Sequence, residues 1–140
     1  MIKVQQPADP WQRTTTEHGM AADEVISALQ KSLRRGMTDN ALLLGWEMYQ
    51  TSVELEEVLW SRLCVIAVED IGMGNPQAPV LIETLYQQHQ RHARPSGDRF
   101  LFAAHAIRVL AGSEKDRTSD DMVNWARQAV ALGEQMPEIP

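Results

Sequence analysis

The chain has 140 residues, the size of one ordinary globular domain, and 44% of them are hydrophobic, which is too many for a disordered protein. No stretch approaches the roughly 18 consecutive apolar residues of a membrane-spanning helix. The formal net charge of −6 argues against attraction of nucleic acid by the surface as a whole, and leaves room only for a local basic patch.

Three segments are expected along the chain. Residues 1–20 read as a flexible N-terminal arm, because Pro7 and Pro10 break any helix there and the first six residues lack the apolar run of a signal peptide. Within this arm, Trp11 has enough apolar area to dock on its own domain or on a neighbouring subunit. Residues 21–133 form the helical domain, and residues 134–140 form an extended tail.

Apolar residues recur at spacings of three and four in six segments, which predicts an all-α, compact bundle of about six helices. The expected helices cover residues 21–35, 40–50, 53–71, 76–92, 98–111 and 118–132. The second is apolar on several sides, so we expect it to be central or covered by another subunit. The third carries two apolar stripes and is the expected centre of the bundle.

Local signals set the expected helix ends. Thr38 or Asp39 can cap the second helix, and Thr51 with Glu54 forms a possible capping box for the third. The segment Gly72-Met73-Gly74 resembles part of a dinucleotide fingerprint, but it follows a helix rather than a strand. We therefore interpret it as a helix stop.

Residues with catalytic or metal-binding chemistry are few. The phosphate-binding motif Gly-x-x-x-x-Gly-Lys-Ser/Thr is absent from the 140 residues, and one cysteine with four scattered histidines does not make a zinc site. His89 and His92 have polar neighbours and are expected on a solvated surface. Cys64 lies among apolar residues, so we expect a buried, inert thiol, and a lone cysteine agrees with a cytoplasmic location. The sequence therefore predicts no cofactor, no metal and no enzyme activity.

His105 is expected on the buried side of the fifth helix, as a hydrogen-bonded core histidine. A less favoured hypothesis pairs it with Glu69 or Asp70 in the pocket of a small-molecule enzyme. That hypothesis requires a concave site that contains these residues.

The adjacent carboxylates Glu69 and Asp70 lie in the last turn of an apolar helix, where the helix dipole disfavours anions. Such a placement predicts specific partners. We expect a structural polar brace, with Arg62 or Arg108 as the candidate cation, or backbone N–H groups of the following loop as donors.

Basic residues gather in two places. Lys31, Arg34 and Arg35 are the candidate contacts to phosphate or DNA, and the alternative interpretation is a solvated helix end that suits the dipole. A second group is Arg91, Arg94 and Arg99. Trp46 and Trp60 lie on helices with wide apolar cover and are the candidate interface residues.

Two motifs resemble a known family. Residues 26–36 (Ile-Ser-Ala-Leu-Gln-Lys-Ser-Leu-Arg-Arg-Gly) are similar to a segment of the C-terminal domain of the RarA family, also called MgsA, with the Werner helicase-interacting protein in eukaryotes. Within residues 65–78, the run Ala67-Val68-Glu69-Asp70-Ile71-Gly72 resembles that family's Ala-x-Glu-Asp-Ile-Gly stretch, followed by a proline as there. The resemblance covers residues 21–112.

The resemblance implies a clamp-loader collar-like helical domain that follows an AAA+ ATPase domain and assembles into tetramers. It implies proteins that act in DNA replication, recombination and repair. For this chain it implies a homo-oligomer, a dimer or a tetramer, or the partner of a separate AAA+ ATPase. DNA binding through the basic patch is the alternative function.

Overall fold

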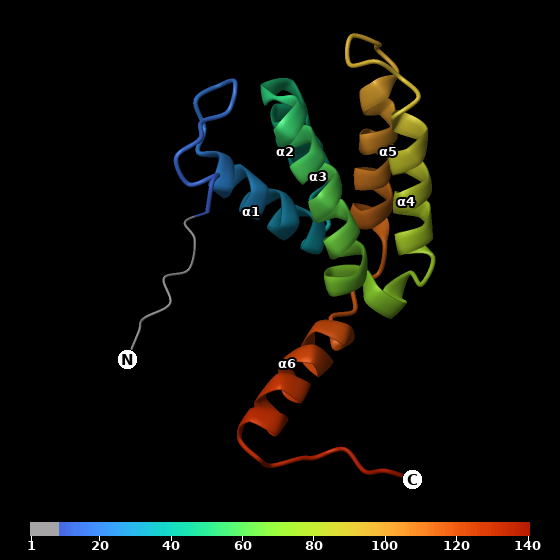
Figure 1. Cartoon of the computed structure of the whole chain (residues 1–140). Helices are drawn as coiled ribbons and strands as arrows, with labels where there is room; N and C mark the ends of the chain where they lie inside the picture. The colour runs from blue at the N-terminus through green and yellow to red at the C-terminus, as the bar shows by residue number, and fades with distance from the viewer. Residues whose placement is uncertain (1–8) are drawn as a thin grey trace.

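A computed structural model describes residues 9–140 and confirms the all-α prediction. Six α-helices follow one another: α1 (Ala22–Arg34), α2 (Thr38–Thr51), α3 (Val53–Ile66), α4 (Ala78–His89), α5 (Arg99–Gly112) and α6 (Thr118–Ala131). Helices α2 to α5 stand side by side, α1 crosses their flank, and α6 projects from one end of the bundle (Figure 1). No helix in the described part of the chain is both long and apolar enough to cross a membrane.

Helices α3 and α5 are both central in the bundle, because each packs against α1, α2 and α4 and the two pack against each other. The buried side chains of α3 show the pattern. Leu55, Leu59, Leu63 and Ile66 repeat at spacings of three and four and are fully buried. Burial of each such side chain contributes roughly 1.5–3 kcal/mol before the entropy of ordering is subtracted.

The third expected helix does not run unbroken to residue 71. After Ile66 the backbone widens into a π-helical turn, η1 (Ala67–Ile71), and then tightens into a 3₁₀ turn, η2 (Gly72–Gly74). Single π-helical turns of this kind are rare and often mark functional positions. Here the turn carries Glu69 and Asp70.

The other helix ends differ from expectation by a few residues. Helix α2 begins at Thr38 with no side-chain cap, and Ser52 rather than Thr51 caps α3, because the Ser52 hydroxyl accepts the Leu55 N–H at 3.0 Å. Helix α4 begins at Ala78 and ends at His89, not at His92.

Residues 9–20 pack on the bundle, although they were expected as part of a flexible arm. Trp11 lies against the core of its own chain. Gly19, at φ +78°, closes a turn that brings His18 to Glu47 of α2. The His18 N–H and ring Nδ1 reach the buried Glu47 carboxylate at 2.8 and 2.7 Å. The expectation of an arm over residues 1–8 lies outside the described residues.

Candidate interaction surfaces

The carboxylates of η1 are held from two directions, as a buried brace requires. Gln30 of α1 donates to Glu69 at 2.8 Å and to Asp70 at 3.0 Å. Arg34 Nε of α1 donates to Asp70 Oδ1 at 2.8 Å, and Arg117 Nε, just before α6, lies 3.3 Å from the same oxygen. Asp70 is 0% exposed. We call these five residues the η1 polar cluster.

The structure does not bring either expected cation to this cluster. Arg62 lines a surface hollow with Trp11, and Arg108 lies on α5 beside α2. The cations that Asp70 meets are Arg34 and Arg117. Arg34 had been assigned to a possible phosphate patch, and Arg117 follows a stretch with little pattern. The sequence therefore indicated that partners were needed without indicating which ones.

The linker between α5 and α6 is fixed to η1 and η2. The Asp116 N–H donates to the Asp70 carbonyl at 3.0 Å. Gly72 sits at φ +50°, and a Cβ there would come within 2.7 Å of the Asp116 carbonyl oxygen. A Cβ on Gly74 would overlap the Glu114 carbonyl. The two glycines thus do more than stop a helix, because they let the linker cross in close contact.

Helix α6 contacts the rest of the chain mainly at η1. Ala129 is its one buried residue. Met122, Trp125, Ala126 and Ala129 follow the spacing i, i+3, i+4, i+7, which places them on one face of the helix. Trp125 is 60% exposed, and Met122 is equally open to solvent. We call these four residues the α6 face.

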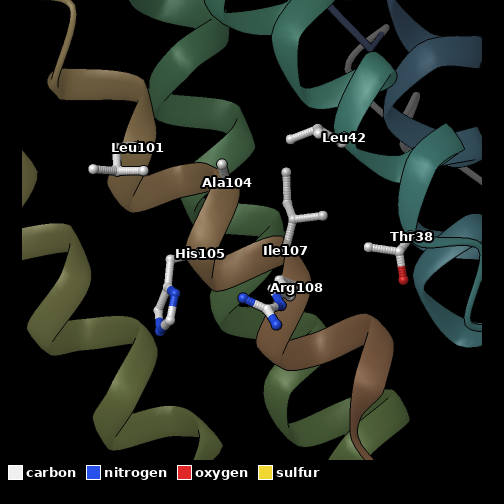
Figure 2. A pocket seen from close by; sticks show the side chains of 7 residues that line it. All are labelled: Thr38, Leu42, Leu101, Ala104, His105, Ile107 and Arg108. Carbon is white, nitrogen blue, oxygen red and sulfur yellow. The ribbon is translucent and has the colours of Figure 1, made fainter.

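A second apolar surface runs between α2 and α5. Figure 2 shows Thr38 and Leu42 on α2 facing a row of α5 residues that includes Leu101, Ala104 and Ile107. The hollow continues along the same two helices to a second set of residues, Leu43, Trp46, Gly97 and Phe100. We call the whole of it the α2/α5 groove. Leu101 is 62% exposed within it.

The two tryptophans expected at an interface occupy different environments. Trp46 is 40% exposed and lines the α2/α5 groove, with its ring 4.9 Å from that of Phe100. Trp60 is 1% exposed and stacks on His89 inside the bundle. Trp60 is therefore a core residue and offers no surface to a partner.

His89 and His105 each lie in the environment that was expected for the other. His89 is fully buried, its Nδ1 contacts the Tyr86 carbonyl, and its Nε2 has no hydrogen-bond partner. Burial lowers the pKa of His89, although the contact with the Tyr86 carbonyl opposes the shift. His105 is exposed instead, at the rim of the α2/α5 groove. Neither Glu69 nor Asp70 lines that groove, so it does not unite them with His105.

Cys64 is exposed rather than buried. Partial desolvation and then the nearby Glu83 charge raise the pKa of its thiol. A raised pKa leaves less thiolate at neutral pH, which lowers reactivity.

Another buried carboxylate, Glu56, is a feature that the sequence analysis missed. It is 2% exposed and accepts hydrogen bonds from Arg94 at 3.0 Å and from Arg99 at 2.9 and 3.0 Å. The contact with Glu56 raises the pKa of Arg99. Two members of the second basic group are thus engaged in tying the loop before α5 to α3. The available signal was the spacing of Glu56, Trp60 and Leu63 on one face of α3.

Of the first basic group, Lys31 and Arg35 are exposed at the end of α1, whereas Arg34 is engaged by Asp70. The candidate phosphate contact therefore has two unengaged cations rather than three.

The sequence of the chain matches one known protein family. The family model described as the C-terminal region of MgsA AAA+ ATPases matches residues 37–140, about three quarters of the chain. The chain belongs to that family. No curated protein matches it.

The match to the MgsA C-terminal family begins at Met37 and so includes both apolar surfaces, the α2/α5 groove and the α6 face. It includes η1 with Glu69 and Asp70 as well. Helix α1, which supplies Gln30 and Arg34 to the η1 polar cluster, precedes the matched range.

Proposed function

We propose that this chain is a non-catalytic oligomerisation and protein-interaction module of a replication-associated AAA+ ATPase. Membership of the MgsA C-terminal family supports the link to an AAA+ ATPase and, through the family's activity, to replication, recombination and repair. Among the described residues, the α2/α5 groove contains His105 but neither Glu69 nor Asp70, which argues against the small-molecule enzyme that would pair them.

The observation that carries the proposal is the amount of apolar side chain left open on two separate surfaces. Contiguous exposed apolar patches on soluble domains usually mark interaction sites. Here the α2/α5 groove exposes Leu43 and Leu101, and the α6 face exposes Met122 and Trp125. A helix with almost no buried residue gains little stability from its own bundle. A partner surface would bury the apolar side chains of α6 that the bundle leaves exposed.

The proposal includes self-association into a dimer or tetramer, with a separate ATPase as a further partner, in the reducing cytoplasm. The single exposed thiol, Cys64, suits a reducing compartment. The DNA-binding alternative has less support, because Arg34 is held by a buried carboxylate.

Light scattering across a concentration series tests self-association. We expect a stable mass of about two or four times the 15.8 kDa of one chain. A matched variant in which Val80, an exposed valine of α4, becomes Glu should keep that mass, because Val80 lies outside both apolar surfaces. A mass of one chain at the highest attainable concentration would reject self-association.

A further inference from the structure

The two apolar surfaces differ in shape. One is a hollow between two helices, and the other is a convex helix face, so each has the form that the other requires. An amphipathic helix that lays its apolar side in a groove is a recurring mode of protein recognition, with anchors at i, i+3, i+4 and i+7. Met122, Trp125 and Ala126 of the α6 face supply the first three of these positions, while Ala129, at the fourth, is already buried in its own chain.

The charges around the two surfaces are also complementary. Among the residues that line the α2/α5 groove in the described chain, Arg108 carries a positive charge and none is a carboxylate. Helix α6 carries Asp120 and Asp121 in its first turn, of which Asp120 is paired with Arg117 of its own chain at 3.2 Å. Asp121 lies one residue before Met122 and four before Trp125, so it borders the α6 face.

Helix α6 is prevented from reaching the groove of its own chain. The linker before it is fixed by the hydrogen bond from Asp116 to Asp70 and by the ion pair of Arg117 with the Asp70 carboxylate. Figure 1 shows α6 extending from the end of the bundle, away from α2. An α6 face held in this direction is available only to another molecule.

We infer that the α6 face of one copy docks in the α2/α5 groove of the next, with Asp121 of one copy facing Arg108 of its neighbour. This inference rests on the proposed self-association and adds which surfaces meet. Because the two surfaces are different, the contact is head-to-tail, and repetition of it closes a ring or extends a chain of copies. An interface of one surface with itself would stop at a dimer.

Two variants separate the halves of this contact. In the first, Leu43→Glu with Leu101→Glu places charge in the groove and leaves α6 intact. In the second, Met122→Gln with Trp125→Gln removes the α6 anchors and leaves the groove intact. All four side chains are largely exposed, so both variants should fold, which circular dichroism checks. The matched controls are Val80→Glu on α4 and Asn124→Ala on the opposite side of α6.

Light scattering on each variant alone should give the mass of one chain, while both controls assemble as the unmodified chain does. An equimolar mixture of the two variants should give about twice 15.8 kDa, because one intact groove then meets one intact α6. If the unmodified chain assembles and the mixture stays at one chain, the head-to-tail contact is wrong and self-association stands. If the unmodified chain is itself a monomer, the proposed self-association is rejected, and the head-to-tail contact is rejected with it.

A charge exchange gives a second test that leaves the apolar residues in place. Arg108→Glu alone should weaken self-association about tenfold, as expected for like charges at an interface. Adding Asp121→Arg to the same chain should restore most of the loss. Equal weakening by the single and the double variant would overturn the pairing of these two residues.

Discussion

At the residue scale, Asp70 shows how this chain accommodates a buried charge. Taking a carboxylate out of water costs several kcal/mol unless charged and hydrogen-bonding partners compensate. Asp70 has Gln30, Arg34 and Arg117 as side-chain partners, and its backbone carbonyl accepts from Asp116. Both arginines remain partly exposed, so their own desolvation is modest. The arrangement therefore joins three segments without burying an unpaired charge.

His89 makes stability depend on pH. Its pKa is lowered by burial, so the unfolded chain binds a proton at a higher pH than the folded chain does. Stability from the neutral ring is present above the ordinary histidine pKa and is lost as the pH falls from there toward the folded-state pKa. We expect His89→Phe, which keeps a ring against Trp60, to flatten the decline of unfolding free energy between pH 7.5 and 5.5. Urea denaturation at several pH values measures this change of unfolding free energy with pH.

The matched control is His105→Gln, because His105 is exposed on α5. It should follow the pH dependence of the unmodified chain. If the unfolding free energy of the His89→Phe variant changes with pH as that of the unmodified chain does, protonation of His89 is not the cause of the pH dependence.

The environments of His89 and His105 show what the sequence could and could not predict about single residues. His89 is flanked by glutamines and an arginine, which suggested solvent. Yet His89 follows Ala78, Ile82 and Leu85 at helical spacing, which is the pattern of the inner face of α4. The prediction of a solvated position gave more weight to the polar neighbours than to this spacing. Helix α5 is apolar on most sides, so its periodicity could not say which way His105 pointed.

At the element scale, the number, order and type of the helices followed from apolar spacing, and the joints between them did not. Apolar periodicity marks a helix, but a π-helical turn keeps the same residue types and changes only the backbone pitch. The sequence therefore predicts one regular helix over residues 53–71, where the structure has a π-helical turn at Ala67–Ile71. The partners of Asp70 come from segments 36 and 47 residues away in the chain, a separation that local patterns do not encode.

Gly72 is the residue on which the joint between η1, η2 and the linker depends. Its φ of +50° is strained for any residue with a Cβ, and an added Cβ would meet the Asp116 carbonyl. We expect Gly72→Ala to lower the unfolding free energy by about 2 kcal/mol or more, since backbone strain and the clash add. Chemical denaturation followed by circular dichroism is the measurement.

Gly112 provides the comparison at the end of α5. A Cβ there meets nothing within 4 Å, so Gly112→Ala should leave stability unchanged or raise it by up to about 1 kcal/mol. Equal effects of the two substitutions would mean that the close approach at Gly72 is not important for stability.

At the scale of the whole molecule, the chain divides into a well-packed bundle and a helix attached at one end. Local stability follows the number of buried apolar contacts, so α6 should open far more readily than α3. In dilute solution we expect the amides of α6 to exchange hydrogen at least about tenfold faster than those of α3. Exchange followed by mass spectrometry of peptides measures this difference.

The same measurement at high protein concentration relates the helix to assembly. Docking of α6 in a groove would slow its exchange, and the amides at the groove should slow at the same concentrations. Protection of α6 that equals that of α3 in dilute solution would contradict this division of the molecule.

In mechanical terms, η1 is the joint of the molecule. Gln30 and Arg34 attach α1 to the Asp70 side chain, while Asp116 and Arg117 attach the base of α6 to the same residue. A tilt of α1 would therefore pull on the base of α6 as well as on the side chains that α1 buries in the core. Polar contacts of this kind break and re-form more easily than packed side chains do. The direction in which α6 points is thus set through one residue, by contacts to the Asp70 carboxylate and to the Asp70 backbone carbonyl.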